Sequence, residues 1–256
     1  MRPRPFALTI LALLSAFGAQ TATAQSITLS PAVVPLAGSF GQSVTSALTL
    51  RNDSDLALEF VMEAQDVVVR DGERVFVEAG ALADSVAASA VFVPRQVRVE
   101  ARSSASVTVT MTLPPTLRHR AAVAFFRGTT PVASGDRSAF LSLGTLFTFA
   151  VSDRLSVAAG ELTARPPTAS ANARLETTLL NDGDEPVVPS GVAAILDAEG
   201  RLLGKAPFAA RRLLPGERST AIADYPGDLR AGVYRTIATF DVAGRDLTLT
   251  GSLEVP

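Results

Sequence analysis

Apolar and polar residues alternate with a period of two along most of the chain, which is the pattern of strands that bury one face. The clearest case is 67–77, where two alternating runs flank Asp71-Gly72, a dipeptide typical of a tight hairpin turn. Similar runs cover 97–113, 195–203 and 240–249, and a polar turn interrupts each of them. Sustained helical periodicity is nearly missing, so the pattern predicts an all-β fold.

One corner of this fold is encoded twice. Residues 47–61 and 176–190 each contain a strand-like run that leads into Asn-Asp-x-Asp, at Asn52 and at Asn181, and then into a second apolar run. Asn and Asp tolerate left-handed backbone angles and hydrogen-bond their own backbone, so each copy indicates strand, tight turn and strand. The repeat predicts two related β-domains in tandem.

A tyrosine near the C-terminus narrows the fold class. Tyr234 follows Gly232 by two residues at the start of a late strand. This is the tyrosine-corner pattern of immunoglobulin-like sandwiches, in which the hydroxyl bonds to the backbone just upstream; the alternative is an ordinary half-buried strand tyrosine. We therefore predict two tandem immunoglobulin-like β-sandwich domains, 26–152 and 153–256.

The N-terminal segment is typical of an export signal. Arg2 and Arg4 precede an apolar run over 6–17, and Ala22-Thr23-Ala24 offers a small-residue cleavage site. The run is shorter than the ~20 residues that span a bilayer. We expect 1–25 to be a cleaved signal peptide and the mature protein to be periplasmic, without membrane insertion.

Composition and motifs favour binding over catalysis. The formal net charge is −2, which gives no basic field for nucleic acid, and the chain has no cysteine. His119 is the only histidine, and an acidic partner for it would have to come from elsewhere in the chain. The acidic turns 53–55 and 182–185 lack the ligand spacing of a calcium loop. We expect no enzyme activity, no cofactor and no metal.

The most apolar segment of the predicted mature chain, 139–151, is a candidate binding strand. One side carries Leu141, Leu143, Phe147 and Phe149, and the other side keeps Phe140 and Leu146. No charge interrupts the run, although edge strands normally need charges to avoid sticking to other strands. It is either a central strand buried on both faces or an edge that receives a partner strand. The candidate partner-binding residues are Phe140, Leu141, Leu143, Leu146, Phe147 and Phe149.

Several segments resemble the periplasmic pilus-assembly chaperones. They are the turn 50–53, the run 92–99, the strand 107–113 that ends at Pro114-Pro115, and the long strand 139–151 before the second domain. The resemblance implies two immunoglobulin-like domains, the first of which lends its last strand to a pilin, and a basic pair between the domains that grips the pilin's C-terminal carboxylate.

The chain departs from this family at the basic pair. The first strand, 26–32, has no arginine, and 139–151 has no lysine. Arg154 lies near the position of the family's hinge arginine, which makes it a further candidate for partner binding; the alternative is an inter-domain salt bridge. The missing pair indicates a divergent member.

These observations predict a non-catalytic, chaperone-like periplasmic protein. Its partner is expected to be a secreted or pilus-type subunit bound by strand addition along 139–151, with an usher-like outer-membrane pore as a possible second partner. The alternative is a structural or adhesive envelope protein that uses its domains as spacers.

Overall fold

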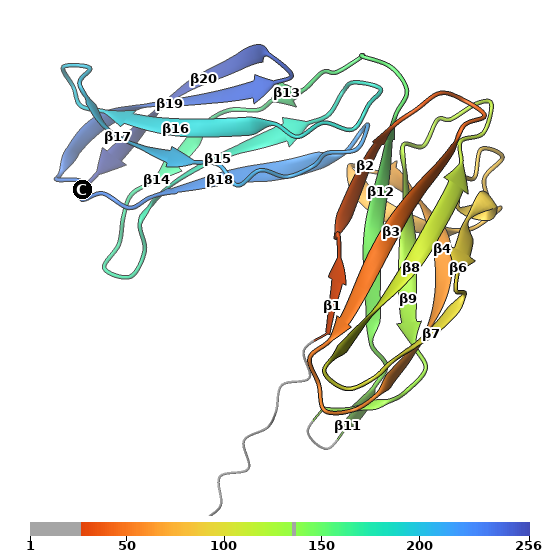
Figure 1. Cartoon of the computed structure of the whole chain (residues 1–256). Helices are drawn as coiled ribbons and strands as arrows, with labels where there is room; N and C mark the ends of the chain where they lie inside the picture. The colour runs from red at the N-terminus through yellow and green to blue at the C-terminus, as the bar shows by residue number, and fades with distance from the viewer. Residues whose placement is uncertain (1–26, 135–136) are drawn as a thin grey trace, which may run out of the picture.

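The computed structural model describes residues 27–134 and 137–256, and this part of the chain is built almost entirely from β-strands (Figure 1). One short 3₁₀ helix, η1 (Ala87–Ser89), interrupts them. Among the described residues, no helix has the length and apolar character needed to cross a membrane. The predicted signal peptide, 1–25, lies outside the described residues.

Two sheets form the first sandwich. One sheet has the order β1 (Ile27–Ser30), β3 (Ser43–Asn52), β8 (Ser103–Thr112) and β6 (Val91–Val93). The other has the order β2 (Val33–Ala37), β12 (Ser142–Ala150), β9 (Ala121–Gly128), β4 (Leu58–Arg70) and β5 (Glu73–Glu78), with β7 (Gln96–Val99) also paired to β4. A small separate hairpin joins β10 (Val132–Ser134) to β11 (Arg137–Ala139).

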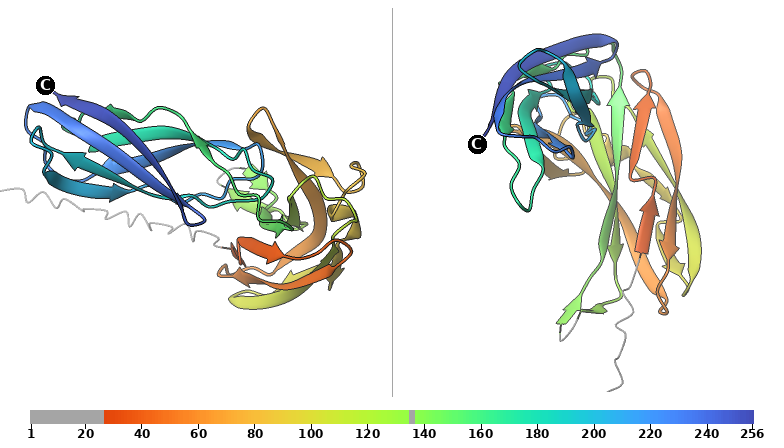
Figure 2. Two further views of the ribbon diagram at one scale, coloured as in Figure 1. Left: turned by 90° about the horizontal axis from the view of Figure 1, so that it is seen from above. Right: turned by 90° about the vertical axis from the view of Figure 1, so that its left-hand side faces the viewer.

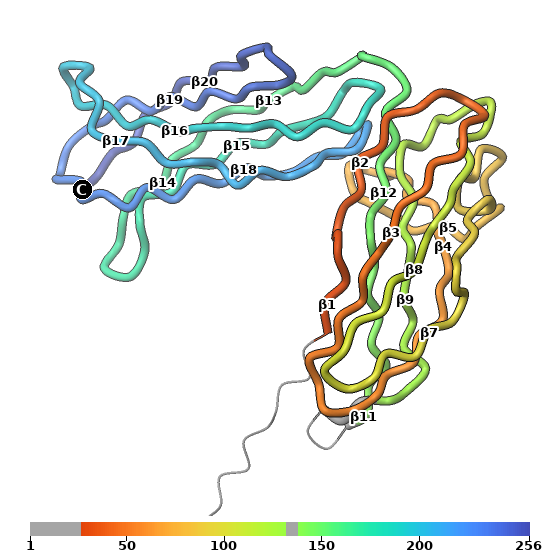
Figure 3. The backbone as a smooth tube through the Cα atoms, viewed as in Figure 1, coloured from red at the N-terminus to blue at the C-terminus, as the bar shows by residue number. Residues whose placement is uncertain are grey.

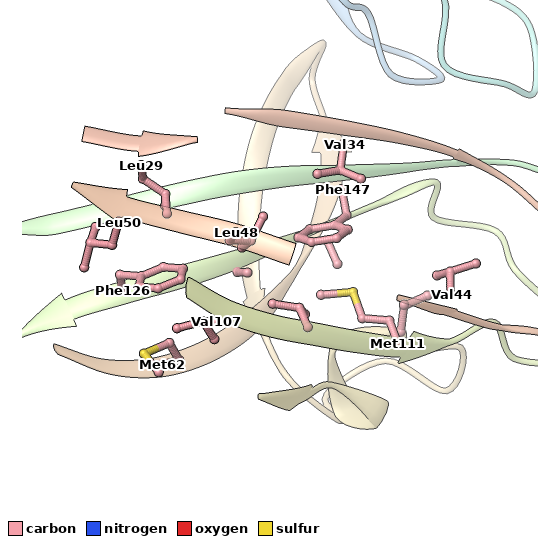
Figure 4. Packing of buried hydrophobic residues seen from close by; sticks show 14 of the residues in the cluster. Leu29, Val34, Val44, Leu48, Leu50, Met62, Val107, Met111, Phe126 and Phe147 are labelled. Carbon is pink, nitrogen blue, oxygen red and sulfur yellow. The ribbon is translucent and has the colours of Figure 1, made fainter. Parts of the chain in front are cut away.

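The core of this sandwich consists of the inward-facing residues of both sheets. Leu48 and Val107 from one sheet meet Phe126 and Phe147 from the other (Figure 4). All four side chains are at most 1% exposed. Burying a side chain of this size stabilises a fold by roughly 1.5–3 kcal/mol, so this alternation holds the two sheets together.

The second sandwich repeats the two-sheet plan. One sheet contains β13 (Ala158–Ala159), β14 (Thr163–Arg165), β15 (Ala173–Leu180) and β18 (Arg218–Tyr225). The other has the order β17 (Leu202–Pro207), β16 (Ser190–Leu196), β19 (Gly232–Val242) and β20 (Arg245–Val255). Its core is separate from the first and includes Leu175, Ile195, Phe240 and Leu253. The predicted fold class, two tandem β-sandwiches, is confirmed.

The two Asn turns predicted from the sequence repeat have the same internal structure. Asn52 is fully buried; its amide donates to the carbonyls of Leu56, Val99 and Glu100, and its oxygen accepts the N–H of Ser54. Asn181 is also fully buried, and its amide donates to the carbonyls of Glu185 and Leu213. Each side chain thus connects its own turn to a distant loop of the same sandwich.

Two further local predictions are confirmed. Tyr234 donates its hydroxyl to the carbonyl of Arg230 at 2.7 Å, as expected for a tyrosine corner. Asp71 and Gly72, between β4 and β5, both have positive φ, at 54° and 85°. This is the requirement of a two-residue hairpin turn whose twist matches that of the strands.

The long axes of the two sandwiches cross, so the molecule is bent (Figures 1 and 2). The chain passes from β12 over the outside of the bend into β13 (Figure 3). The predicted domain boundary at 152–153 falls on this connection. On the inside of the bend, the tip of the β4–β5 hairpin reaches the second sandwich, where the N–H of Arg218 donates to the carbonyl of Gly72 at 2.9 Å.

Candidate functional site

Strand β12 is central along one half and an edge along the other. It pairs with β9 from Ser142 to Thr148, but with β2 only from Leu146 to Ala150. Within the described residues, no strand pairs with the second side of Ser142 to Thr145. The sequence left an edge and a central strand as alternatives, and each is correct for one half of β12.

The open half arises because the chain passes from one sheet to the other between β1 and β2. β1 pairs with β3 in the opposite sheet, whereas β2 pairs with β12. The crossing lies between them, where Thr145 donates its hydroxyl to the carbonyl of Pro31 at 2.8 Å and Leu146 donates its N–H to Ala32 at 3.0 Å. The right-hand view of Figure 2 shows the segment containing β1 and β2 beside β12. Before Thr145, no strand in the described part of the chain lies beside β12 in its own sheet, and we call this place the vacancy.

The backbone groups that face this vacancy follow from the alternation of hydrogen-bond direction along β12. Leu141 accepts a bond from Gly128 on the β9 side, whereas Leu146 and Ala150 bond to the β2 side. Because bonding direction alternates along a strand, odd-numbered residues face β9 and even-numbered residues face away from it. The N–H and C=O groups of Ser142 and Gly144 therefore point into the vacancy.

The candidate residues on the inner face of β12 divide into two pairs. Phe147 and Phe149 are 1% and 0% exposed and belong to the core. These two side chains are therefore not accessible to a partner, because the opposite sheet covers the inner face of the paired half of β12. Leu141 and Leu143 are half-buried where the two sheets separate, and they pack against the same core. Both lie at the open half.

The two candidates on the outer face have different environments. Phe140 is 66% exposed, next to the open half. Leu146 is half-buried in a third apolar cluster, which contains Val67, Val123 and Leu214. Leu214 comes from the second sandwich, so the outer face of Leu146 contributes to the joint between the sandwiches. This explains why both sides of 139–151 are apolar.

A buried ion pair crosses the joint. The guanidinium of Arg120, at the start of β9, lies 3.3 Å from the carboxylate of Glu185 in the second Asn turn; their side chains are 10% and 0% exposed. Glu185 also accepts the N–H of Val151 at 3.3 Å and the hydroxyl of Ser152 at 2.7 Å. This pair could not be predicted from the sequence, because its members are far apart in the chain and each belongs to a run of ordinary turn residues.

A second ionic contact joins the β4–β5 hairpin to the second sandwich. The carboxylate of Glu217 is 1% exposed and lies 2.9 Å from Arg74 and 3.2 Å from Arg211. Arg74 also donates to the carbonyl of Arg212 at 2.6 Å. Cations of the first sandwich thus meet acidic side chains of the second at two points of the joint.

Arg154 forms an exposed ion pair with Asp184 at 3.0 Å, with side-chain exposures of 77% and 54%. Asp184 belongs to the same predicted domain as Arg154, so the pair is local rather than inter-domain. Exposed pairs of this kind contribute about 0–1 kcal/mol. The guanidinium remains accessible near the bend, and a contact with a partner stays a prediction.

No acidic residue lies next to His119 in the sequence. In the structure, Asp84 is its acidic partner. Its carboxylate accepts the N–H of Arg118 at 2.7 Å and lies 3.2 Å from Nδ1 of His119. Burial raises the pKa of Asp84, but the backbone hydrogen bond from Arg118 and the charge of His119 together outweigh it, so that the pKa lies below its ordinary value. The arrangement connects two loops of the first sandwich.

This lowered pKa predicts a pH dependence of stability. The ionised form of Asp84 stabilises the fold above the carboxyl's unfolded pKa of about 3.9, and this contribution is lost as the pH falls through the lower folded value. The urea midpoint of wild type should therefore exceed that of Asp84→Asn at pH 7, and the two midpoints should converge near pH 3. Asp153→Asn, at an exposed position, is the matched control. A difference that does not change with pH contradicts the assignment.

Comparisons with known proteins agree with the expected resemblance. No family model and no curated protein matches the chain. Among solved structures, the class 5 fimbriae chaperone CfaA is 13% identical, with a TM-score of 0.46 and coverage of 90% of this chain and 100% of that one. The Pseudomonas aeruginosa chaperone CupB2 is 13% identical, with a TM-score of 0.44 and coverage of 88% and 100%. The E. coli chaperone DraB is 16% identical, with a TM-score of 0.42 and coverage of 91% and 98%. All three are chaperones by name, at low sequence identity, and the likeness says nothing of the site.

Proposed function

We propose that the protein is a non-catalytic, chaperone-like protein that binds a secreted or pilus-type subunit by strand addition at the open half of β12. The observation that carries the proposal is the change in pairing along this strand, which has two neighbours from Leu146 to Thr148 and one neighbour from Ser142 to Thr145. An extended segment of another protein fits this place, because it completes the sheet.

The side chains around the open half support this use. Edge strands are normally blunted by charges or proline, and 138–145 contains neither. Leu141 and Leu143 are half-buried there, and Phe140 is exposed beside them. An added strand covers apolar surface as well as unpaired backbone.

The backbone hydrogen bonds of the open half do not by themselves give a stable complex. The N–H and C=O groups of Ser142 and Gly144 allow four hydrogen bonds, which at about 1 kcal/mol each contribute about 4 kcal/mol. Association costs at least about 4 kcal/mol in lost freedom of motion. The affinity must therefore come from the side chains of the partner strand, at roughly 1.5–3 kcal/mol for each large apolar group that becomes buried.

Proline at position 142 tests the proposal. Ser142→Pro removes the N–H that points into the vacancy and leaves the bonds to β9 in place, because Ser142 does not donate to β9. We expect at least a tenfold loss of binding, since a lost hydrogen bond and the bulk of the ring act together. The measurement is the amount of secreted subunit that co-purifies with the tagged protein from the periplasm.

The matched control is Ser142→Ala. It loses the same side-chain hydroxyl, which accepts a bond from Arg127 at 2.7 Å, but keeps the backbone donor. Equal capture by the two variants, with the same urea midpoint, rules out strand addition at this edge.

A further inference from the structure

The open half of β12 presents no side chain on its outer face at Gly144. This residue pairs with Phe125 on β9. A Cβ atom built on Gly144 lies 3.0 Å from Cγ2 of Val123 and 3.2 Å from Cε1 of Phe125. The ring of Phe125 therefore occupies the space beside Gly144 that a side chain normally fills, and the backbone of Gly144 is exposed next to it.

Aromatic and cationic groups surround Phe125. Its ring meets Phe76 edge to face, with centroids 5.3 Å apart, and the guanidinium of Arg127 lies 4.1 Å from its centroid. Phe76 is 54% exposed although it is a large apolar residue. The rings of Phe76 and Phe125 and the guanidinium of Arg127 form one surface on the outer face of the sheet; Phe125, on the strand next to β12, is the ring nearest the vacancy.

At the level of Ser142, the outer-face residues of β12 and β9 are polar. Arg127 donates to the hydroxyl of Ser142 at 2.7 Å and to the carboxylate of Glu63 at 2.8 Å. The first bond lies at the level of Ser142, whereas the second runs diagonally to the row of Gly144, because Arg127 pairs with Val61 and Phe125 pairs with Glu63. An apolar side chain on an added strand is thus favoured at the level of Gly144 and disfavoured at the level of Ser142.

We infer that the partner strand carries a large apolar side chain, preferably aromatic, at the position that pairs with Gly144. Such a side chain lies across the glycine and contacts the ring of Phe125. A cross-strand aromatic stabilises a glycine in a sheet in this way, because it covers backbone that the glycine leaves exposed. The inference rests on the proposed strand addition and specifies the chemistry of the strand that is added.

Tethered peptides test the inference. Because the chain has no cysteine, Ala139→Cys provides a unique attachment point at an exposed position beside the open half. A peptide with the alternating sequence Thr-Val-Thr-Val-X-Val-Thr-Val-Thr is attached there by a disulfide through a short Gly-Ser linker. The sequence is symmetric about X, so it can pair in either direction, and the tether supplies a high effective concentration. Three peptides carry Phe, Leu or Ala at X.

The readout is hydrogen–deuterium exchange at the amides of Ser142 and Gly144. We expect protection at both amides, at least fivefold stronger with Phe at X than with Ala and intermediate with Leu. In Phe125→Thr, the Phe and Ala peptides should protect within twofold of each other. The control is Val93→Thr, which introduces the same residue at an exposed position on the opposite sheet and should keep the full preference for Phe.

The outcomes separate the two proposals. Protection that is the same for Phe and Ala overturns the inference and leaves strand addition in place. A preference for Phe that survives in Phe125→Thr also overturns it. If none of the three peptides protects Ser142 and Gly144, the proposed strand addition itself fails.

Discussion

Replacing Arg120 with methionine is expected to lower the free energy of unfolding by about 3–5 kcal/mol, since removing one member of a buried ion pair leaves the other charged and unpaired. Glu185 is the member that remains, and its side chain is 0% exposed. Methionine keeps most of the volume of the arginine stem, so the loss reports the charge rather than a cavity. With an m-value of about 1–3 kcal/mol/M, the urea midpoint should fall by about 1 M or more.

The control for this prediction is Arg154→Met. Arg154 also pairs with a carboxylate of the second Asn turn, Asp184, but both side chains are largely exposed. We expect a change of less than about 1 kcal/mol for this variant, because solvent screens an exposed pair. Equal effects of the two substitutions contradict the assigned role of the Arg120–Glu185 pair.

A double variant distinguishes the effect of the unpaired charge from the effect of the other contacts of Arg120. Arg120→Met combined with Glu185→Gln removes both charges, and it should recover a large part of the stability lost in Arg120→Met. Part of the loss should remain, because Arg120 also donates to the carbonyl of Asp184 at 3.1 Å. Hydrogen exchange on both sides of the joint identifies whether the two sandwiches loosen together.

Asn52→Asp and Asn181→Asp are expected to destabilise the protein by roughly 3 kcal/mol or more each. The substitution preserves shape but replaces an amide donor with an acceptor, so that an oxygen faces carbonyl groups that the amide had satisfied. For Asn52 these are the carbonyls of Leu56, Val99 and Glu100, at 2.7, 3.2 and 3.1 Å. Each buried carbonyl that loses its donor costs about 1–3 kcal/mol.

Thermal or urea unfolding measures this effect, and Asn172→Asp is the control at an exposed position. We expect Asn52→Asp to reduce protection against exchange in the first sandwich and Asn181→Asp to reduce it in the second. A change at Asn52 or Asn181 as small as at Asn172 contradicts the role of these side chains as connections between loops.

The features that the sequence predicted correctly are those in which the cause lies within a few residues. Asp71-Gly72 adopts a hairpin turn because its two residues accept positive φ, and Tyr234 reaches the carbonyl of Arg230, four residues upstream. The same holds for the repeated Asn turns. In each case at least one backbone partner is local, so composition and spacing contain that part of the information; the bonds of the two Asn amides to distant loops were not predictable.

The candidate site stays a prediction, and the structure shows only where its residues lie. The segment 139–151 has the composition of a binding strand, and the open half does carry Phe140, Leu141 and Leu143 at accessible or half-buried positions. The side of the strand with Phe147 and Phe149 has the pattern of a core face, whereas the extent of the open half and the contact of Leu146 with Leu214 were not predictable. They depend on which strand lies beside each residue, and this is set by pairings between residues more than 60 positions apart.

By itself, the sequence determined an all-β fold of two related sandwiches and located an uncharged apolar strand, because alternation and turn chemistry are local properties of the chain. The tertiary structure alone decided where that strand is open. The first strand crosses between sheets beside Thr145 and Leu146, and buried ion pairs place the second sandwich over the outer face of Leu146. Both depend on the packing of segments distant in the chain, where the partner of each residue is chosen by the whole fold.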